Sequence, residues 1–152
     1  KLVKIADIKN AQIIIELGAG RWPVTREILK HKNPQTRLIL IENNHESFLY
    51  LQSEFGQFAE VYEMSAAHLH SLLELNSVDI VISTLPLWSI SHPGVAHILD
   101  SIRQVLRSGW RYIQYQYALQ NLKDVKKYFT VDRIFFEPFN IWPAFIYKTH
   151  KK

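Results

Sequence analysis

Short apolar runs alternate with helix-like segments along most of this chain, and this alternation restricts the fold more than any other feature of the sequence. Alternation of this kind is typical of strands and helices built around a parallel sheet that is buried on both faces. We therefore predict an α/β fold. The five expected strands lie at residues 11–16, 37–42, 58–63, 78–84 and 110–117.

The clearest predicted helix covers residues 94–107, where apolar residues recur at the spacing of three and four that gives one buried face. Ser91 and Pro93 mark its start, and Gly109 is expected to mark its end. Three other helices are predicted. One begins at Pro23, one covers residues 45–55 and stops at Gly56, and one covers residues 121–128.

The alternation stops after residue 128. Residues 130–138 and 140–149 are two strand-like segments with no room for a helix between them, so they predict an antiparallel hairpin. Pro143 falls in the second segment, where it would remove one ladder hydrogen bond and cause a bulge or an edge. With no repeat or linker, residues 1–152 are expected to form a single domain, with a short region of ten residues before the first strand.

Composition excludes several kinds of site. The chain has no cysteine, which rules out disulfides, thiolate metal sites and cysteine nucleophiles and is compatible with the cytoplasm. The histidine pairs His68 with His70 and His92 with His97 have no third ligand at metal spacing, so no metal is expected. A net charge of +4, with lysines gathered at 123–127, leaves an anionic lipid surface or nucleic acid open as a partner.

Gly18 and Gly20 directly follow the first expected strand, where they let the backbone turn sharply and bring a ligand to the start of the next helix. NAD is disfavoured, because Pro23 stands where the dinucleotide fingerprint needs a third glycine and because Glu16 would repel a pyrophosphate. A carboxylate at Glu16 suits a cationic ligand such as S-adenosylmethionine (SAM). Glu42 ends the second strand, near the spacing of about 20 residues at which an acid meets a ribose diol.

Residues 16–20 together with 24–29 resemble motif I of the class I SAM-dependent methyltransferases. The resemblance implies a Rossmann-like, mostly parallel seven-stranded sheet of order 3-2-1-4-5-7-6, with a C-terminal antiparallel hairpin and helices on both faces. It also implies that SAM is the cofactor. The residues expected to bind it here are those of the turn, including Ala19, with Glu42 at the ribose and Asn43 along the adenine.

Other parts of this motif set depart from the family. Residues 64–69 resemble a Gly-Asp-Ala-x-x-Leu stretch whose aspartate receives the adenine amino group, but Ser65 replaces the aspartate and Ala66 follows it. Trp22 takes the place of the third glycine, where its indole would cover the methionine part of the cofactor, point outward or fill the pocket. Arg21 is expected to pair with the methionine carboxylate.

The fourth strand ends in Ser-Thr-Leu-Pro-Leu-Trp at residues 83–88. Enzymes that methylate adenine N6 carry Asn or Asp and an aromatic residue where this chain has Thr84 and Leu87, so a flipped base is a poor fit. Residues 85–87, the tyrosines near residue 117 and residues 140–147 resemble the bacterial phospholipid N-methyltransferases. In that family a tyrosine after the fifth strand and a proline in the last strand border the substrate pocket, which implies this role for Tyr117 and Pro143. Thr84 is expected to bind the cofactor, and Pro86, Leu87 and Tyr117 are expected to form the acceptor site.

Tyr117 is expected to orient the acceptor amine through its hydroxyl or ring face, although Tyr115 and Tyr117 fit ordinary strand alternation equally well. The expected reaction is methyl transfer from SAM to an amine nitrogen of a phosphatidylethanolamine-type lipid or a small molecule, with peripheral contact to an anionic membrane left open. The helices that touch the bilayer in that family precede the first strand, where only ten residues stand here.

Two alternatives stay open from the sequence. An RNA or protein methyltransferase is favoured by the basic charge and opposed by Thr84 and Leu87, which makes nucleic acid the less expected partner. A degenerate domain that has lost SAM binding and acts only in assembly is favoured by Trp22, Ser65 and the short N-terminal region.

Overall fold

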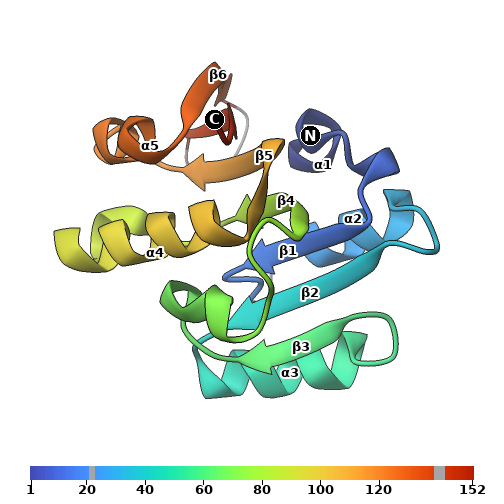
Figure 1. Ribbon diagram of the computed structural model, residues 1–152. Helices are drawn as coiled ribbons and strands as arrows, with labels where there is room; N and C mark the ends of the chain where they lie inside the picture. Colours follow the sequence, from blue (N-terminus) through green and yellow to red (C-terminus); the bar gives the residue numbers. More distant parts are fainter. Residues whose placement is uncertain (21–22, 139–142) are drawn as a thin grey trace.

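A computed structural model describes residues 1–20, 23–138 and 143–152, and these residues form a seven-stranded sheet with helices on both faces (Figure 1). The strand order is β3-β2-β1-β4-β5-β7-β6, which confirms the order implied by the sequence. The strands are β1 (Ile13–Leu17), β2 (Arg37–Glu42), β3 (Glu60–Glu63), β4 (Val78–Ser83), β5 (Leu106–Gln116), β6 (Thr130–Glu137) and β7 (Ala144–His150).

The helices of the described residues divide between the two faces of the sheet (Figure 1). Apolar residues of α4, α5 and η2 pack with Ile15 and Leu17 of β1, whereas α1, α2 and α3 pack with Ile14 on the other face. Neighbouring strand residues therefore serve opposite cores, as the alternation of a strand requires. The helical segments are α1 (Leu2–Ala6), η1 (Ile8–Asn10), α2 (Val24–His31), α3 (His45–Phe55), η2 (Ala66–Ser71), η3 (Leu87–Ser89), α4 (His92–Val105) and α5 (Leu122–Tyr128).

The junction between α4 and β5 differs from the sequence prediction. The start is as predicted, because the Ser91 hydroxyl caps the helix by accepting a hydrogen bond from the Gly94 amide. The helix ends at Val105, however, and β5 begins at the next residue. Gly109 lies inside β5 with φ 76°, near an irregularity in the pairing of β4 with β5, so its predicted role as a helix stop is wrong.

A buried carboxylate joins three strands at the amino edge of the sheet. The side chain of Asp79 is fully buried and accepts hydrogen bonds from the backbone amides of Gln12 (2.6 Å) and Ile13 (3.0 Å). It also accepts one from Arg107 Nη1 at 2.6 Å. Asp79 thus holds the beginnings of β1 and β5 on β4, at the edge opposite the glycine turn.

The predicted C-terminal hairpin is confirmed. β6 pairs antiparallel with β7, which in turn pairs antiparallel with β5. Pro143 is exposed and directly precedes β7, so it removes no hydrogen bond from that strand, and its predicted place inside the strand is wrong. Within the described ranges, every helix is too short or too polar to cross a bilayer.

Candidate active site

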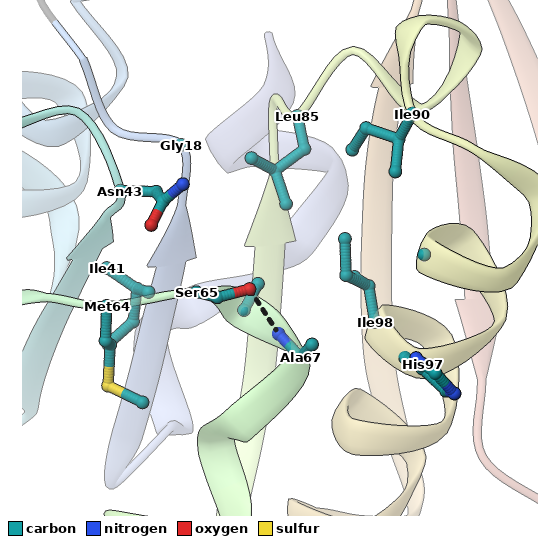
Figure 2. A pocket seen from close by; sticks show the side chains of 12 residues that line it. Gly18, Ile41, Asn43, Met64, Ser65, Ala67, Leu85, Ile90, His97 and Ile98 are labelled. Atoms are coloured by element: carbon teal, nitrogen blue, oxygen red, sulfur yellow. Dashed lines mark hydrogen bonds between the residues drawn. The ribbon is translucent and has the colours of Figure 1, made fainter.

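A cavity of about 270 Å³ opens at the carboxyl edge of the sheet, between the ends of β1, β2 and β3 and the helical segments η2 and α4 (Figure 2). Its volume is close to the roughly 300 Å³ at which ligand pockets begin. Four of the residues predicted to bind the cofactor line this cavity: Gly18, Asn43, Ser65 and Ala66. The edge is also the one where open α/β sheets bind their ligands.

The turn after β1 needs a glycine at position 18. Gly18 has φ 69°, and a Cβ atom added there would lie 2.8 Å from Cδ2 of Leu85. Any larger residue would therefore combine a strained backbone with a steric clash. The Gly18 amide donates to the carbonyl oxygen of Ile41 at 2.9 Å, which brings the turn against the end of β2.

Glu42 closes the same turn from the second strand. Its Oε2 accepts a hydrogen bond from the Gly20 amide at 3.0 Å, and its Oε1 accepts one from the Asn44 amide at 2.8 Å. A carboxylate has about four acceptor positions, so two remain for other donors. Glu42 is thus held in a position from which it can still accept hydrogen bonds from a diol. Ala19, between the two glycines, is buried.

Glu16, on β1, is the most perturbed carboxyl group of this region. Its side chain is 0% exposed, and its Oε2 accepts a hydrogen bond from the Thr25 hydroxyl at 2.7 Å. Its Oε1 has no hydrogen-bond partner in the part of the chain that the structure describes. Burial raises the pKa of Glu16 to about 8, although the Thr25 hydrogen bond opposes the shift. A nearby cation would restore the carboxylate.

The polar side chains of the cavity come from three places: the end of β2, the end of β3 and α4. The Ser65 hydroxyl accepts a hydrogen bond from the Ala67 amide at 3.3 Å, so this residue caps η2 (Figure 2). Asn43 lies on the same side of the cavity as Ser65, whereas His97 stands beside Ile98 on α4. In the sequence, His97 was considered only as a metal ligand together with His92, and no metal was expected there. Its position on α4 carried no sign that it would reach this cavity.

The loop after β4 connects the cavity to the predicted acceptor side. The Thr84 hydroxyl donates to the carbonyl oxygen of Gly18 at 2.8 Å, which ties this loop to the glycine turn. Pro86 precedes η3, and Leu87 is fully buried in the core. Leu85, which belongs to the Leu-Pro-Leu element but was not among the predicted site residues, lines the cavity together with Ile90 of the same connection.

Tyr117 stands just beyond the end of β5 with 39% of its side chain exposed. Its ring packs edge-to-face on that of Tyr115, with the centroids 5.5 Å apart. Tyr117 is therefore partly open to solvent, and its predicted role in orienting an amine stays a prediction.

Arg21, Trp22 and residues 139–142 lie outside the described residues, so the pairing expected of Arg21 and the three placements considered for Trp22 stay predictions. Among the residues that are described, no group of three or more histidine, aspartate or glutamate side chains could hold a metal ion.

Comparisons with known proteins complete this description. No protein-family model matches the sequence. The chain is 27% identical over 145 residues to the ornithine lipid N-methyltransferase of Singulisphaera acidiphila, a match that covers 91% of this chain and 76% of that protein. Among solved structures, the N-methyltransferase NodS from Bradyrhizobium japonicum matches with a TM-score of 0.84 at 11% identity, over 99% of this chain and 92% of that one.

The chain has the class I methyltransferase fold. A TehB-like SAM-dependent methyltransferase from Corynebacterium glutamicum also matches, with a TM-score of 0.76 at 13% identity over 99% of this chain and 87% of that one. NodS has also been solved in complex with S-adenosyl-L-homocysteine (SAH). These matches confirm the resemblance to class I and lipid N-methyltransferases that was predicted from the sequence, and they support SAM as the cofactor.

Proposed function

We propose that this protein is a SAM-dependent N-methyltransferase whose acceptor is the amine of a lipid headgroup. The observation that carries the proposal is the buried, half-paired carboxyl of Glu16 beneath a glycine turn that Glu42 closes, on a methyltransferase fold. The choice of a lipid is supported by the relative from Singulisphaera, which is named for N-methylation of an ornithine lipid.

The residues around the turn fit the chemistry of SAM. Gly18 allows a close approach of the ligand, the free acceptor positions of Glu42 suit the ribose hydroxyls, and Asn43, Ser65 and Ala66 border a space for the adenine. Glu16 lies beneath the turn on the α2 side of the sheet, and its carboxyl, which burial keeps largely protonated at neutral pH, would become a carboxylate when the cationic methionine part binds at the turn. When bound, SAM supplies a methyl group on a positively charged sulfur that an amine can attack.

For the acceptor, the protein has to provide alignment and exclusion of water, and the amine has to arrive without its proton. The rim beyond β4 and β5 is apolar: Trp88 is 55% exposed, Leu119 44% and Tyr117 39%. Solvent-exposed side chains of this kind favour the interface of a lipid layer over water.

The same rim carries positive charge on α5. His92, at the start of α4, lies 3.8 Å from Asp124 of α5, which brings α5 next to the loop that carries Trp88. Lys123 and Lys126 of α5 form no ion pair within the described residues. Free lysines beside exposed apolar residues suit an anionic membrane surface, which supports peripheral membrane contact of this protein.

Binding and transfer can be tested together. We expect calorimetry to show micromolar binding of SAM, and a labelled methyl group to enter an ornithine lipid or phosphatidylethanolamine in vesicles more readily than free ornithine or ethanolamine. Glu42→Ala should weaken SAM binding about tenfold or more, because the diol and the Gly20 amide both lose their acceptor. Glu74→Ala, an exposed glutamate away from the cavity, is the matched control.

Three outcomes contradict the proposal. The absence of saturable heat at millimolar SAM would leave only a degenerate methyltransferase fold. If the labelled methyl group enters the RNA or protein fraction of a cell extract and not the lipid fraction, the methyl acceptor is RNA or protein. If Glu42→Ala binds SAM as tightly as the wild type does, Glu42 at the end of β2 does not bind the ribose.

A further inference from the structure

Three buried side-chain oxygens lack a hydrogen-bond partner within the described residues, and all three lie toward the carboxyl edge of the sheet: Glu16 Oε1, Gln116 Oε1 and Asn121 Oδ1. The two amide oxygens are acceptors, and the Glu16 oxygen is one when its carboxyl is ionised. Because an unpaired buried acceptor is unfavourable, native proteins rarely leave one without a use. The set therefore points to a ligand that brings N–H groups, and the cofactor site already accounts for Glu16.

Gln116 is the last residue of β5 and faces the side of the sheet that carries the cavity. Residues 112, 114 and 116 alternate along β5, so their side chains point to the same face. Tyr112 packs on that face with residues of α4, and Ile98 of α4 lines the cavity. Tyr115 points to the opposite face, where it contacts Tyr117.

Hydrogen bonds fix the orientation of the Gln116 carboxamide. Its Nε2 donates to the carbonyl oxygen of Leu85 at 2.8 Å, so a reversed amide would place two oxygens against each other. Gln114 donates to the same carbonyl oxygen at 3.1 Å, and its own Oε1 accepts from the Tyr112 hydroxyl. Both the nitrogen and the oxygen of the Gln114 carboxamide thus form hydrogen bonds within the protein, whereas the oxygen of the Gln116 carboxamide forms none within the described residues.

The position of Gln116 links it to the cofactor pocket. Leu85, whose carbonyl oxygen it holds, lines the cavity and packs against Gly18 (Figure 2). Asn121, the other unassigned residue, lies at the start of α5, outside the residues that line the cavity. Gln116 is therefore the unassigned acceptor with a direct contact to a cavity residue.

We propose that Gln116 binds the acceptor amine, with its Oε1 accepting a hydrogen bond from an N–H of that amine. The inference rests on the proposed function and names the residue that orients the nucleophile. A neutral carboxamide suits this task, because it holds the N–H without favouring the protonated amine as a carboxylate would. The nitrogen lone pair, which must attack, is left free.

Substitution of Gln116 tests this role. Gln116→Met has a similar length but no acceptor, and Gln120→Met changes an exposed glutamine four residues further along as the matched control. We expect Gln116→Met to bind SAH within about twofold of the wild type and to lose about tenfold or more in kcat/KM for the lipid amine, because the amine is no longer aligned. Gln120→Met should match the wild type in both.

Gln116→Glu gives a readout that a merely structural role would not change. The introduced carboxylate stabilises the protonated amine, so the pH at which kcat/KM is half-maximal should move upward from the wild-type value. A profile that does not move contradicts a contact between residue 116 and the amine.

Nuclear magnetic resonance tests the contact in the wild type, without activity and without dependence on the folding of a variant. The side-chain amide signal of Gln116, assigned by its loss in Gln116→Met, should shift when short-chain phosphatidylethanolamine is added to the SAH-bound protein. An unmoved signal, or equal kcat/KM for Gln116→Met and Gln120→Met, overturns the inference while transfer by the wild type continues. A wild type that binds no SAM would instead refute the proposed function.

Discussion

Glu16 shows how one residue can connect folding stability to ligand charge. Its folded-state pKa of about 8 lies above the ordinary value of 4.5 because burial disfavours the carboxylate. Between these two values the folded protein keeps a proton that the unfolded chain has released. Stability from this group is therefore fully present below pH 4.5 and is lost as the pH rises toward 8.

Glu16→Gln removes this titration and keeps an acceptor for the Thr25 hydroxyl. We expect the variant to be more stable than the wild type at pH 8, by an amount on the order of a few kcal/mol. The difference should shrink toward pH 5, and SAM affinity should fall because the cationic ligand loses its partner. Thermal unfolding at the two pH values and calorimetry with SAM check this. A stability difference independent of pH would contradict it, and Glu74→Gln serves as the control.

Sequence reasoning identified the residues of the turn but not their partners. The spacing of Gly18, Gly20 and Glu42 is visible in the chain, because a tight turn and a strand end leave local signals. The burial of Glu16 against Thr25 and the hydrogen bond from Gly20 to Glu42 depend on how α2 and β2 pack, which no local pattern contains. Gln116 was missed because a glutamine between tyrosines fits any half-buried strand.

Among the elements, β5 departs furthest from expectation. It begins directly after α4 and includes Gly109, whose φ of 76° would normally indicate a turn or the end of a helix. The strand tolerates this conformation because its pairing with β4 is irregular between Val78 and Ile80. A glycine near the end of an apolar helix was read as a stop signal, and tertiary pairing with β4 decided otherwise.

Gly109→Ala isolates the cost of this conformation. A Cβ atom at position 109 would meet nothing within 4 Å, so no clash contributes. We expect the variant to lose about 1 kcal/mol of folding stability, the usual cost of a left-handed conformation for a residue with a side chain. Urea unfolding of wild type and variant measures it. Equal stability would mean that the backbone around residue 109 relaxes to a negative φ.

The remaining elements were predicted well where their signal was long. The strands nearest the centre of the sheet are continuous apolar runs, and α4 has a clear repeat and a serine cap, so their existence followed from the chain alone. The short helix α1 was not predicted, because its five residues are too few to show a periodicity. The order of the strands came from the resemblance to a known fold, since strand patterns do not reveal which neighbours pair.

At the scale of the whole molecule, the carboxyl edge divides into two parts. The ends of β1, β2 and β3 form the cavity, while the ends of β4 and β5 lead to an apolar and basic rim beside α5. The two parts meet at the loop that follows β4. This division fits the proposed function, in which SAM binds in the cavity and the lipid amine is presented at the rim.

Membrane contact can be tested through the charge of α5. We expect the protein to sediment with vesicles that contain an anionic phospholipid, and Lys123→Glu combined with Lys126→Glu to weaken this about tenfold or more, at about 1 kcal/mol for each lysine near a charged surface. The binding should also weaken at high salt. Lys4→Glu combined with Lys9→Glu, at exposed positions before β1, is the control, and equal loss in both pairs would contradict a specific surface.

Leu85 gives this division a mechanical consequence. Its side chain presses on the glycine turn, while the oxygen of the same residue is held by two glutamine amides of β5. A displacement of this one residue therefore moves atoms that contact both the glycine turn and the end of β5. The two parts of the edge are joined by a single peptide group rather than by an entire helix.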